Sequence, residues 1–226
     1  MVQSKYKRLS YNISEETTPS ANGRWHHKVR YASIESMEKG DRANVYIVEL
    51  LNHCGTHIDC PRHQIANGKR LVDFPIDQYI YENPIVVDVP VSDEQNVEPV
   101  HLEHSGDLLA QADLVLIRSG FSRFRSDLDR YTWKTPGVSA ETAQYLVDHC
   151  PQLKAIGVDF LSLELLLDMS HDFAAHRIFL SRDILILEDL NLQDLDNENL
   201  KRVFAFPLFV EGIDSFPVTV AAELAH

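Results

Sequence analysis

The chain has 226 residues, 44% of them hydrophobic and 24% charged, which is the composition of an ordinary globular protein that can bury a sizeable core. Its net charge of −13 argues against nucleic acid and anionic membrane surfaces as partners, because both attract basic patches. The 3 cysteines are too few for a disulfide scaffold, no stretch approaches the roughly 20 apolar residues of a membrane span, and the N-terminus lacks the apolar core of a secretory signal, so we expect a cytoplasmic protein.

Short apolar runs recur along the chain and predict strands. Each run has the length of a strand and is rich in β-branched or aromatic residues. Several are nearly all apolar, which is typical of strands buried on both faces. The runs cover residues 45–51, 85–89, 114–117, 155–160, 184–187, 203–210 and 218–222.

Fewer helices are expected between these strands. The clearest is predicted over residues 139–150, where Ser139 is a good N-cap and Glu141 lies in the favoured first turn. The apolar stripe of this helix consists of Ala140, Ala143, Leu146 and Val147. A second helix is predicted over roughly residues 172–180.

Two segments, residues 22–28 and residues 92–99, have the composition of loops. Neither they nor any other stretch has the character of a linker. We therefore predict a single strand-rich α/β domain over residues 1–226.

Residues 53–63, with the sequence HCGTHIDCPRH, hold three histidines and one aspartate within a short stretch. Imidazole nitrogens and carboxylate oxygens are the ligands of zinc-like ions. Gly, Thr and Pro disfavour a helix here, and in extended chain His53, His57, Asp59 and His63 point to one face. A straight strand would separate His53 from Asp59 by about 20 Å. The chain therefore has to bend, and Gly55 permits it.

An isolated histidine is usually a surface residue or one whose hydrogen bonds are satisfied, but two histidines and an aspartate at this spacing favour a metal site. Cys54 and Cys60 could act as soft ligands. We favour the interpretation that both are small packing residues, since one neighbour of each ligand must face the core. The chain has no G-x-S-x-G nucleophile elbow, which argues against a serine hydrolase.

The same stretch resembles the H-x-G-T-H-x-D-x-P-x-H signature of the cyclase family of metal-dependent hydrolases, which includes kynurenine formamidase and isatin hydrolase. The likeness extends, in the family's order, over roughly residues 45–222. Further segments that are similar to family motifs are RSGF (118–121), TPGVS (135–139), IGVD (156–159), HR (176–177), ILILEDL (184–190), FPL (206–208) and GIDSFPV (212–218).

This resemblance implies a β/β/α fold and a set of site residues. His53, His57 and Asp59 would bind a metal ion, and His176 and Glu188 would complete a two-metal site with Asp59 or Glu188 as a bridge. Taken alone, His176 and Glu188 would be interpreted as a helix-surface and a strand-end residue. His63 would be the acid/base residue. The ions would be zinc or manganese, and the chain would form a homodimer or a larger homo-oligomer.

The function that the resemblance implies is hydrolysis of amide-type small molecules, with N-formylkynurenine-like aryl formamides as the first expectation. The alternatives are a cyclic amide such as isatin, a cyclase or dehydratase reaction, and a non-catalytic protein that binds metal or a small molecule. Three departures from the family bear on the substrate. The family's aromatic-Pro-Gly element is absent from residues 15–23, Phe121 replaces a tryptophan, and Cys60 replaces a smaller residue.

Overall fold

The computed structural model describes residues 4–15, 18–19, 29–165, 173–195 and 199–225. A nine-stranded mixed sheet forms the body of the protein, which confirms the prediction of a strand-rich α/β fold. The strand order is β5 (Ile80–Tyr81), β12 (Leu200–Pro207), β13 (Ser215–Leu224), β4 (His57–Asp59), β11 (Leu185–Glu188), β10 (Ala155–Val158), β8 (Leu114–Arg118) and β6 (Pro84–Asp88), with β1 (Tyr6–Arg8) paired to β13.

The strands from β11 to β6 are parallel to one another, whereas β4, β13, β12 and β5 pair in antiparallel fashion. Successive residues of β8 enter two different hydrophobic clusters. Val115 and Ile117 belong to the cluster that includes the helices, and Leu114 and Leu116 belong to the cluster shared with β12 and β13. This burial on both faces is what the nearly all-apolar runs predict.

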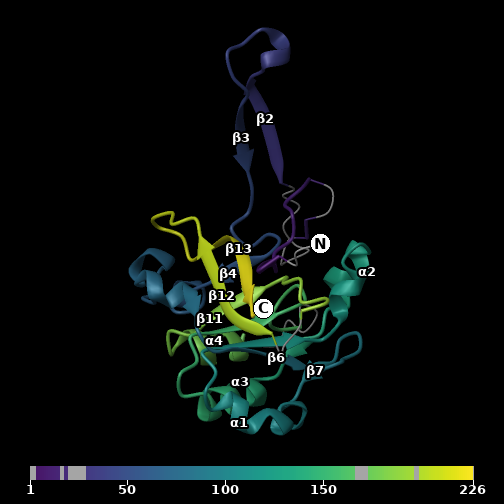
Figure 1. Ribbon diagram of the computed structural model, residues 1–226, viewed down its shortest axis with the longest axis vertical. Helices are drawn as coiled ribbons and strands as arrows, with labels where there is room; N and C mark the ends of the chain where they lie inside the picture. The colour runs from purple at the N-terminus through teal and green to yellow at the C-terminus, as the bar shows by residue number, and fades with distance from the viewer. Residues whose placement is uncertain (1–3, 16–17, 20–28, 166–172, 196–198, 226) are drawn as a thin grey trace.

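The helices are α1 (Gly106–Leu109), α2 (Leu128–Trp133), α3 (Ala140–His149) and α4 (Ala174–Leu180). Helices α1 and α3 lie at the lower end of the molecule in Figure 1, α4 lies nearer the sheet, and α2 lies at the right-hand side. The N-cap prediction for α3 is confirmed, because the hydroxyl of Ser139 accepts the N–H of Thr142. The helix predicted at residues 172–180 corresponds to α4. No helix in the described part of the chain is long and apolar enough to cross a membrane.

Some bounds that the sequence predicts differ from those in the structure. The predicted loop 92–99 is wrong in part, because β7 (Asn96–Val97) pairs with β9 (Gly137–Val138) in a two-stranded sheet. A strand of two residues is too short to produce a periodic pattern. The predicted strand 203–210 ends at Pro207, and the predicted loop 22–28 lies outside the described residues.

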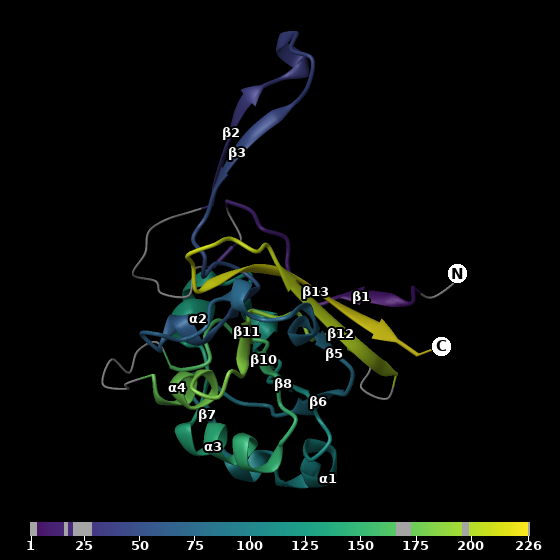
Figure 2. The ribbon, with the colours of Figure 1, turned by 90° about the vertical axis from the view of Figure 1, so that its left-hand side faces the viewer.

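A hairpin of β2 (Arg30–Glu35) and β3 (Val45–Glu49) projects from the body as an arm (Figures 1 and 2). The strand predicted at 45–51 therefore exists, but it is not buried. All residues of both arm strands are exposed. The apolar side chains that the arm presents are Tyr31, Ile34, Val45, Tyr46, Ile47 and Val48.

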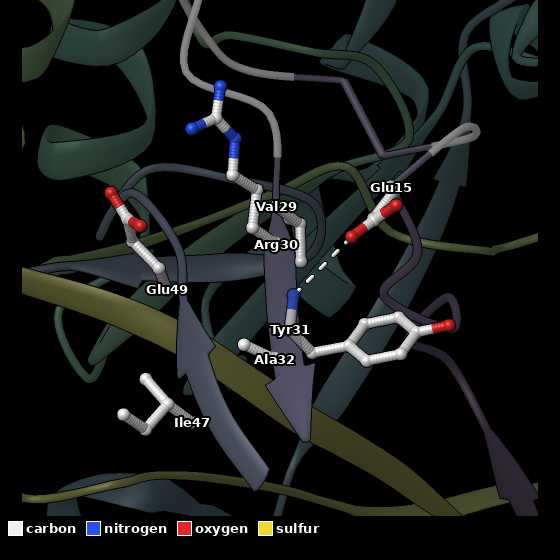
Figure 3. A pocket seen from close by; sticks show the side chains of 7 residues that line it. All are labelled: Glu15, Val29, Arg30, Tyr31, Ala32, Ile47 and Glu49. Atoms are coloured by element: carbon white, nitrogen blue, oxygen red, sulfur yellow. Dashed lines mark hydrogen bonds between the residues drawn. The ribbon is translucent and has the colours of Figure 1, made fainter. Parts of the chain in front are cut away.

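A hollow lies at the base of this arm (Figure 3). Its lining includes Glu15, whose carboxylate accepts the backbone N–H of Tyr31 at 3.3 Å. Val29, Arg30, Ala32, Ile47 and Glu49 complete the lining. The hydrogen bond ties the arm to the segment that follows β1.

Candidate metal centre

Strand β4 lies in the middle of the sheet, between β13 and β11, and presents two of the predicted ligands on one face. His57 and Asp59 share that face because side chains alternate along a strand. Ile58, between them, is fully buried in the opposite cluster of core residues. The register places Glu188 of β11 directly beside His57, so the sheet itself brings this carboxylate to the imidazole.

The bend expected at Gly55 is present. Gly55 has a φ of 61°, a left-handed conformation that other residues rarely adopt. Its carbonyl oxygen lies 2.8 Å from Nδ1 of His57. A carbonyl only accepts, so Nδ1 of His57 carries the proton and Nε2 is left as the metal-binding nitrogen. The bend also brings His53 back over the strand, with Nδ1 3.0 Å from Oδ1 of Asp59.

The structure also places His176 and Glu188 in this cluster. Nε2 of His176, on α4, lies 3.4 Å from Oε1 of Glu188, and Oε2 of Glu188 lies 3.1 Å from Nε2 of His57. Both residues are buried, each with 2% exposure. His176 is therefore not a helix-surface residue, and Glu188, although it is the last residue of β11, is buried within the cluster.

His63 lies at the more open side of the cluster, at the end of a short 3₁₀ turn (Pro61–His63). Its Nδ1 is 2.8 Å from Oδ2 of Asp214, and its side chain is 23% exposed. The same carboxylate oxygen lies 3.2 Å from Nε2 of His53. Asp214 thus joins the predicted acid/base histidine to a predicted ligand.

Several buried atoms of this cluster lack hydrogen-bond partners within the described part of the chain. They are Nε2 of His57 and both carboxylate oxygens of Asp59, whose neighbours at 3.0–3.6 Å are not aligned for hydrogen bonding. Unsatisfied buried polar atoms are rare in proteins and call for an ion or water. Three groups have ligand atoms within 4.8 Å of one another: His53, His57 and Asp59; His53, His63 and Asp214; and Asp59, His63 and His176.

The donor set fits a divalent metal ion, because imidazole and carboxylate groups suit zinc and manganese. The charges agree with this. Burial opposes the charged form of His53 and His176, but the neighbouring carboxylates outweigh it and raise the pKa of both to about 10. Burial alone would raise the pKa of Glu188 and Asp214, yet the adjacent histidines hold both below the usual range. The cluster therefore favours bound positive charge.

Supporting residues that the sequence did not single out surround this cluster. Asp214 was part of a family-like segment, but its pairing with His63 was not predicted. Glu164, in the loop after β10, lies 2.6 Å from Nδ1 of His176 and had no sequence signal. Asp189 is fully buried, and its carboxylate accepts two hydrogen bonds from Arg125 at 2.8 and 2.7 Å.

The three residues with uncertain roles in the sequence are all buried. Cys54 and Cys60 are 3% and 0% exposed and belong to none of the metal-ligand groups found among the described residues. Cys60 lies in the core cluster that contains Ile58. Phe121 stacks on Tyr131 within the core cluster that includes the helices.

Comparison with known proteins gives a consistent assignment. The family model named Cyclase matches residues 8–165. Kynurenine formamidase of Erythrobacter litoralis is 33% identical over 178 residues, which cover 78% of this chain and 76% of that protein. Isatin hydrolase A of Labrenzia aggregata has the same fold, with a TM-score of 0.84, 18% identity, and coverage of 98% of this chain and 94% of that one.

A second solved structure, described as a potential metal-dependent hydrolase with cyclase activity, aligns with a TM-score of 0.77 and 22% identity over 96% of both chains. At these identities the two structures establish the fold, and the sequence matches establish the family. The chain therefore belongs to the cyclase family.

Proposed function

We propose that this protein is a metal-dependent hydrolase of amide-type substrates. The observation that carries the proposal is the set of buried, unsatisfied atoms on His57 and Asp59 at the centre of a histidine and carboxylate cluster. Leaving such atoms without partners costs about 1–3 kcal/mol each. A bound cation removes that cost, so metal binding accounts for their arrangement.

We propose zinc or manganese, with up to two ions per chain. His53, His57 and Asp59 would hold one ion, and His176 with Glu188 would hold the other, Asp59 or Glu188 serving as the bridge. Such ions supply Lewis-acid activation of a carbonyl oxygen and of water. The buried histidines and carboxylates contribute by fixing the donor atoms before substrate arrives, since all of them except His53 are at most 2% exposed.

His63 would carry the protons. Its Nδ1 is engaged by Asp214, so Nε2 is the nitrogen that can take a proton from water and return it to a leaving nitrogen. The carboxylate of Asp214 holds the imidazole of His63 in one orientation. Partial exposure of His63 is consistent with access for a substrate.

For the substrate we propose an aryl formamide such as N-formylkynurenine. The support is the relative at 33% identity that is named a kynurenine formamidase. A cyclic aryl amide such as isatin is the second candidate, supported by the likeness in fold to isatin hydrolase A. The test is a comparison of kcat/KM of the metal-loaded protein for N-formylkynurenine and isatin. A preference for isatin would overturn the formamide assignment, and turnover of no amide, imide or lactone would favour a binding protein.

We also propose that the chain forms a homodimer or larger homo-oligomer through the β2–β3 arm. A two-stranded hairpin alone is marginally stable in water, and this one exposes apolar side chains on both of its faces. Exposed apolar residues on the body, Leu208 and Phe209, offer a complementary surface on a second copy. Strand β3 ends only four residues before His53, so association would also steady the site.

A further inference from the structure

Glu164 is a buried carboxylate that lies outside the predicted ligand set and contacts one of its members. Its Oε2 lies 2.6 Å from Nδ1 of His176, and its Oε1 accepts the backbone N–H of Ala175 at 3.0 Å. The side chain is 9% exposed. One carboxylate therefore holds both the imidazole of His176 and the first turn of α4 that carries it.

This contact decides which nitrogen of His176 faces the candidate metal centre. A carboxylate only accepts hydrogen bonds when ionised, so it keeps the proton on Nδ1. The lone pair is then on Nε2, which lies 3.4 Å from Oε1 of Glu188. Carboxylates that orient a metal-binding histidine in this way tune the affinity of the site.

The residue before Glu164 acts on the other member of the pair. The backbone N–H of Leu163 donates to Oε1 of Glu188 at 2.6 Å. Two successive residues of one loop thus orient both Glu188 and His176. His57 has a different orienting partner, the carbonyl of Gly55, so Glu164 does not orient the imidazole on the other side of the centre.

We propose that Glu164 is a positioning residue that sets the affinity of the ion held by His176 and Glu188, an inference that rests on the proposed metal-dependent function. Loss of such an orienting contact lowers metal affinity about 10–100-fold. The ion on the side of His53, His57 and Asp59 should keep its affinity, because Glu164 makes no hydrogen bond or ion pair with those residues in the described part of the chain.

Glu164→Gln is the sharpest variant, because it keeps the size of the side chain while it removes the negative charge and the ability to accept at both oxygens. The amide oxygen can accept from Ala175 or from Nδ1 of His176, but not both. If it accepts from Ala175, the amide NH₂ donates to Nδ1, which forces the proton onto Nε2 and blocks metal binding.

Asp113→Asn is the matched control. Asp113 is also buried, at 5% exposure, and accepts two backbone N–H groups, those of Glu82 and Asn83 at 2.8 and 2.9 Å. It precedes β8, at the N-terminal ends of the parallel strands, whereas Glu188 lies at the C-terminal end of β11. Its substitution reproduces the structural cost of losing a buried capping carboxylate without touching a ligand.

The experiment titrates the metal-free full chain with zinc against a chromophoric chelator and observes the histidine side chains by ¹⁵N NMR of the zinc-loaded protein. We expect two classes of site in the wild type and in Asp113→Asn. In Glu164→Gln we expect one class to weaken about 10–100-fold, the other to change less than about twofold, and the Nδ1–H signal of His176 to disappear.

The positioning role would be overturned if Glu164→Gln binds zinc with the same two affinities as the wild type and keeps the Nδ1–H signal of His176. That result would leave the proposed function intact. The positioning role would also be overturned if both variants weaken both classes of zinc site to the same extent, because the effect would then come from a loss of stability. A wild type that binds zinc at one class or none would overturn both the two-ion proposal and this inference.

Discussion

Replacing His63 by alanine separates proton transfer from metal binding in the candidate centre. The variant removes an imidazole whose only close partner among the described carboxylates is Asp214, at 2.8 Å. The buried atoms of His57 and Asp59 stay in place, because the Gly55 carbonyl and the β4 register hold them. Metal content should therefore remain near that of the wild type.

Turnover should fall much further. Loss of a general acid/base usually lowers the rate by about 10²–10⁴-fold. That range corresponds to about 2.7–5.4 kcal/mol in the activation barrier. The loss should appear in kcat, since the same proton is moved only in the transition state.

The assay is steady-state kinetics on N-formylkynurenine, with metal content of the same sample measured by plasma mass spectrometry. His57→Ala is the comparison, because it removes a buried ligand. Metal loss in His63→Ala as severe as in His57→Ala would refute the acid/base role and make His63 a ligand. Full activity in His63→Ala would mean that another group carries the proton, and Glu188 is then the next candidate.

Three further predictions follow from the geometry. Gly55→Ala should lower the free energy of unfolding by about 1–2 kcal/mol, because alanine disfavours the left-handed conformation, and it should also weaken metal binding. Gly40→Ala is the control, since Gly40 has a φ of 93° and open space around it, and urea titration should show only the loss of stability. Burial lowers the pKa of His53 and His176, but the neighbouring carboxylates raise it to about 10, so zinc must displace protons from both residues. The affinity of the protein for zinc should therefore rise from about pH 6 to about pH 8, and an affinity that does not change with pH would contradict this. Ile47→Asp, at 59% exposure on the arm, should convert a homo-oligomer to monomers by light scattering, and a wild type already monomeric and fully active at micromolar concentration would refute the arm as an interface.

The sequence predicts the strands that are buried on both faces best. Residues 114–117, 155–160 and 184–187 are nearly all apolar because β8, β10 and β11 lie between two hydrophobic clusters. The run at 45–51 has the same character for a different reason, since it forms an exposed arm. A local apolar pattern cannot distinguish a strand that is buried within the chain from one that is exposed on its surface.

The sequence predicts best those residues of the candidate site that lie close together along the chain. His53, His57 and Asp59 share one bent segment, so their spacing carries the signal. His176 and Glu188 lie in a helix and a strand with no local pattern, and only the family resemblance indicated them. Glu164 acts through a contact between the loop after β10 and α4, which arises from the tertiary fold. No local feature of the sequence encodes that contact.

Metal content per chain tests the central claim most directly. The full-length protein, purified from metal-replete medium, should contain up to two zinc or manganese ions per chain by plasma mass spectrometry. His57→Ala and Asp59→Asn should lose metal while remaining folded by circular dichroism, and chelation should abolish activity of the wild type. A protein that holds no metal under these conditions and yet hydrolyses its substrate at the full rate would contradict the account.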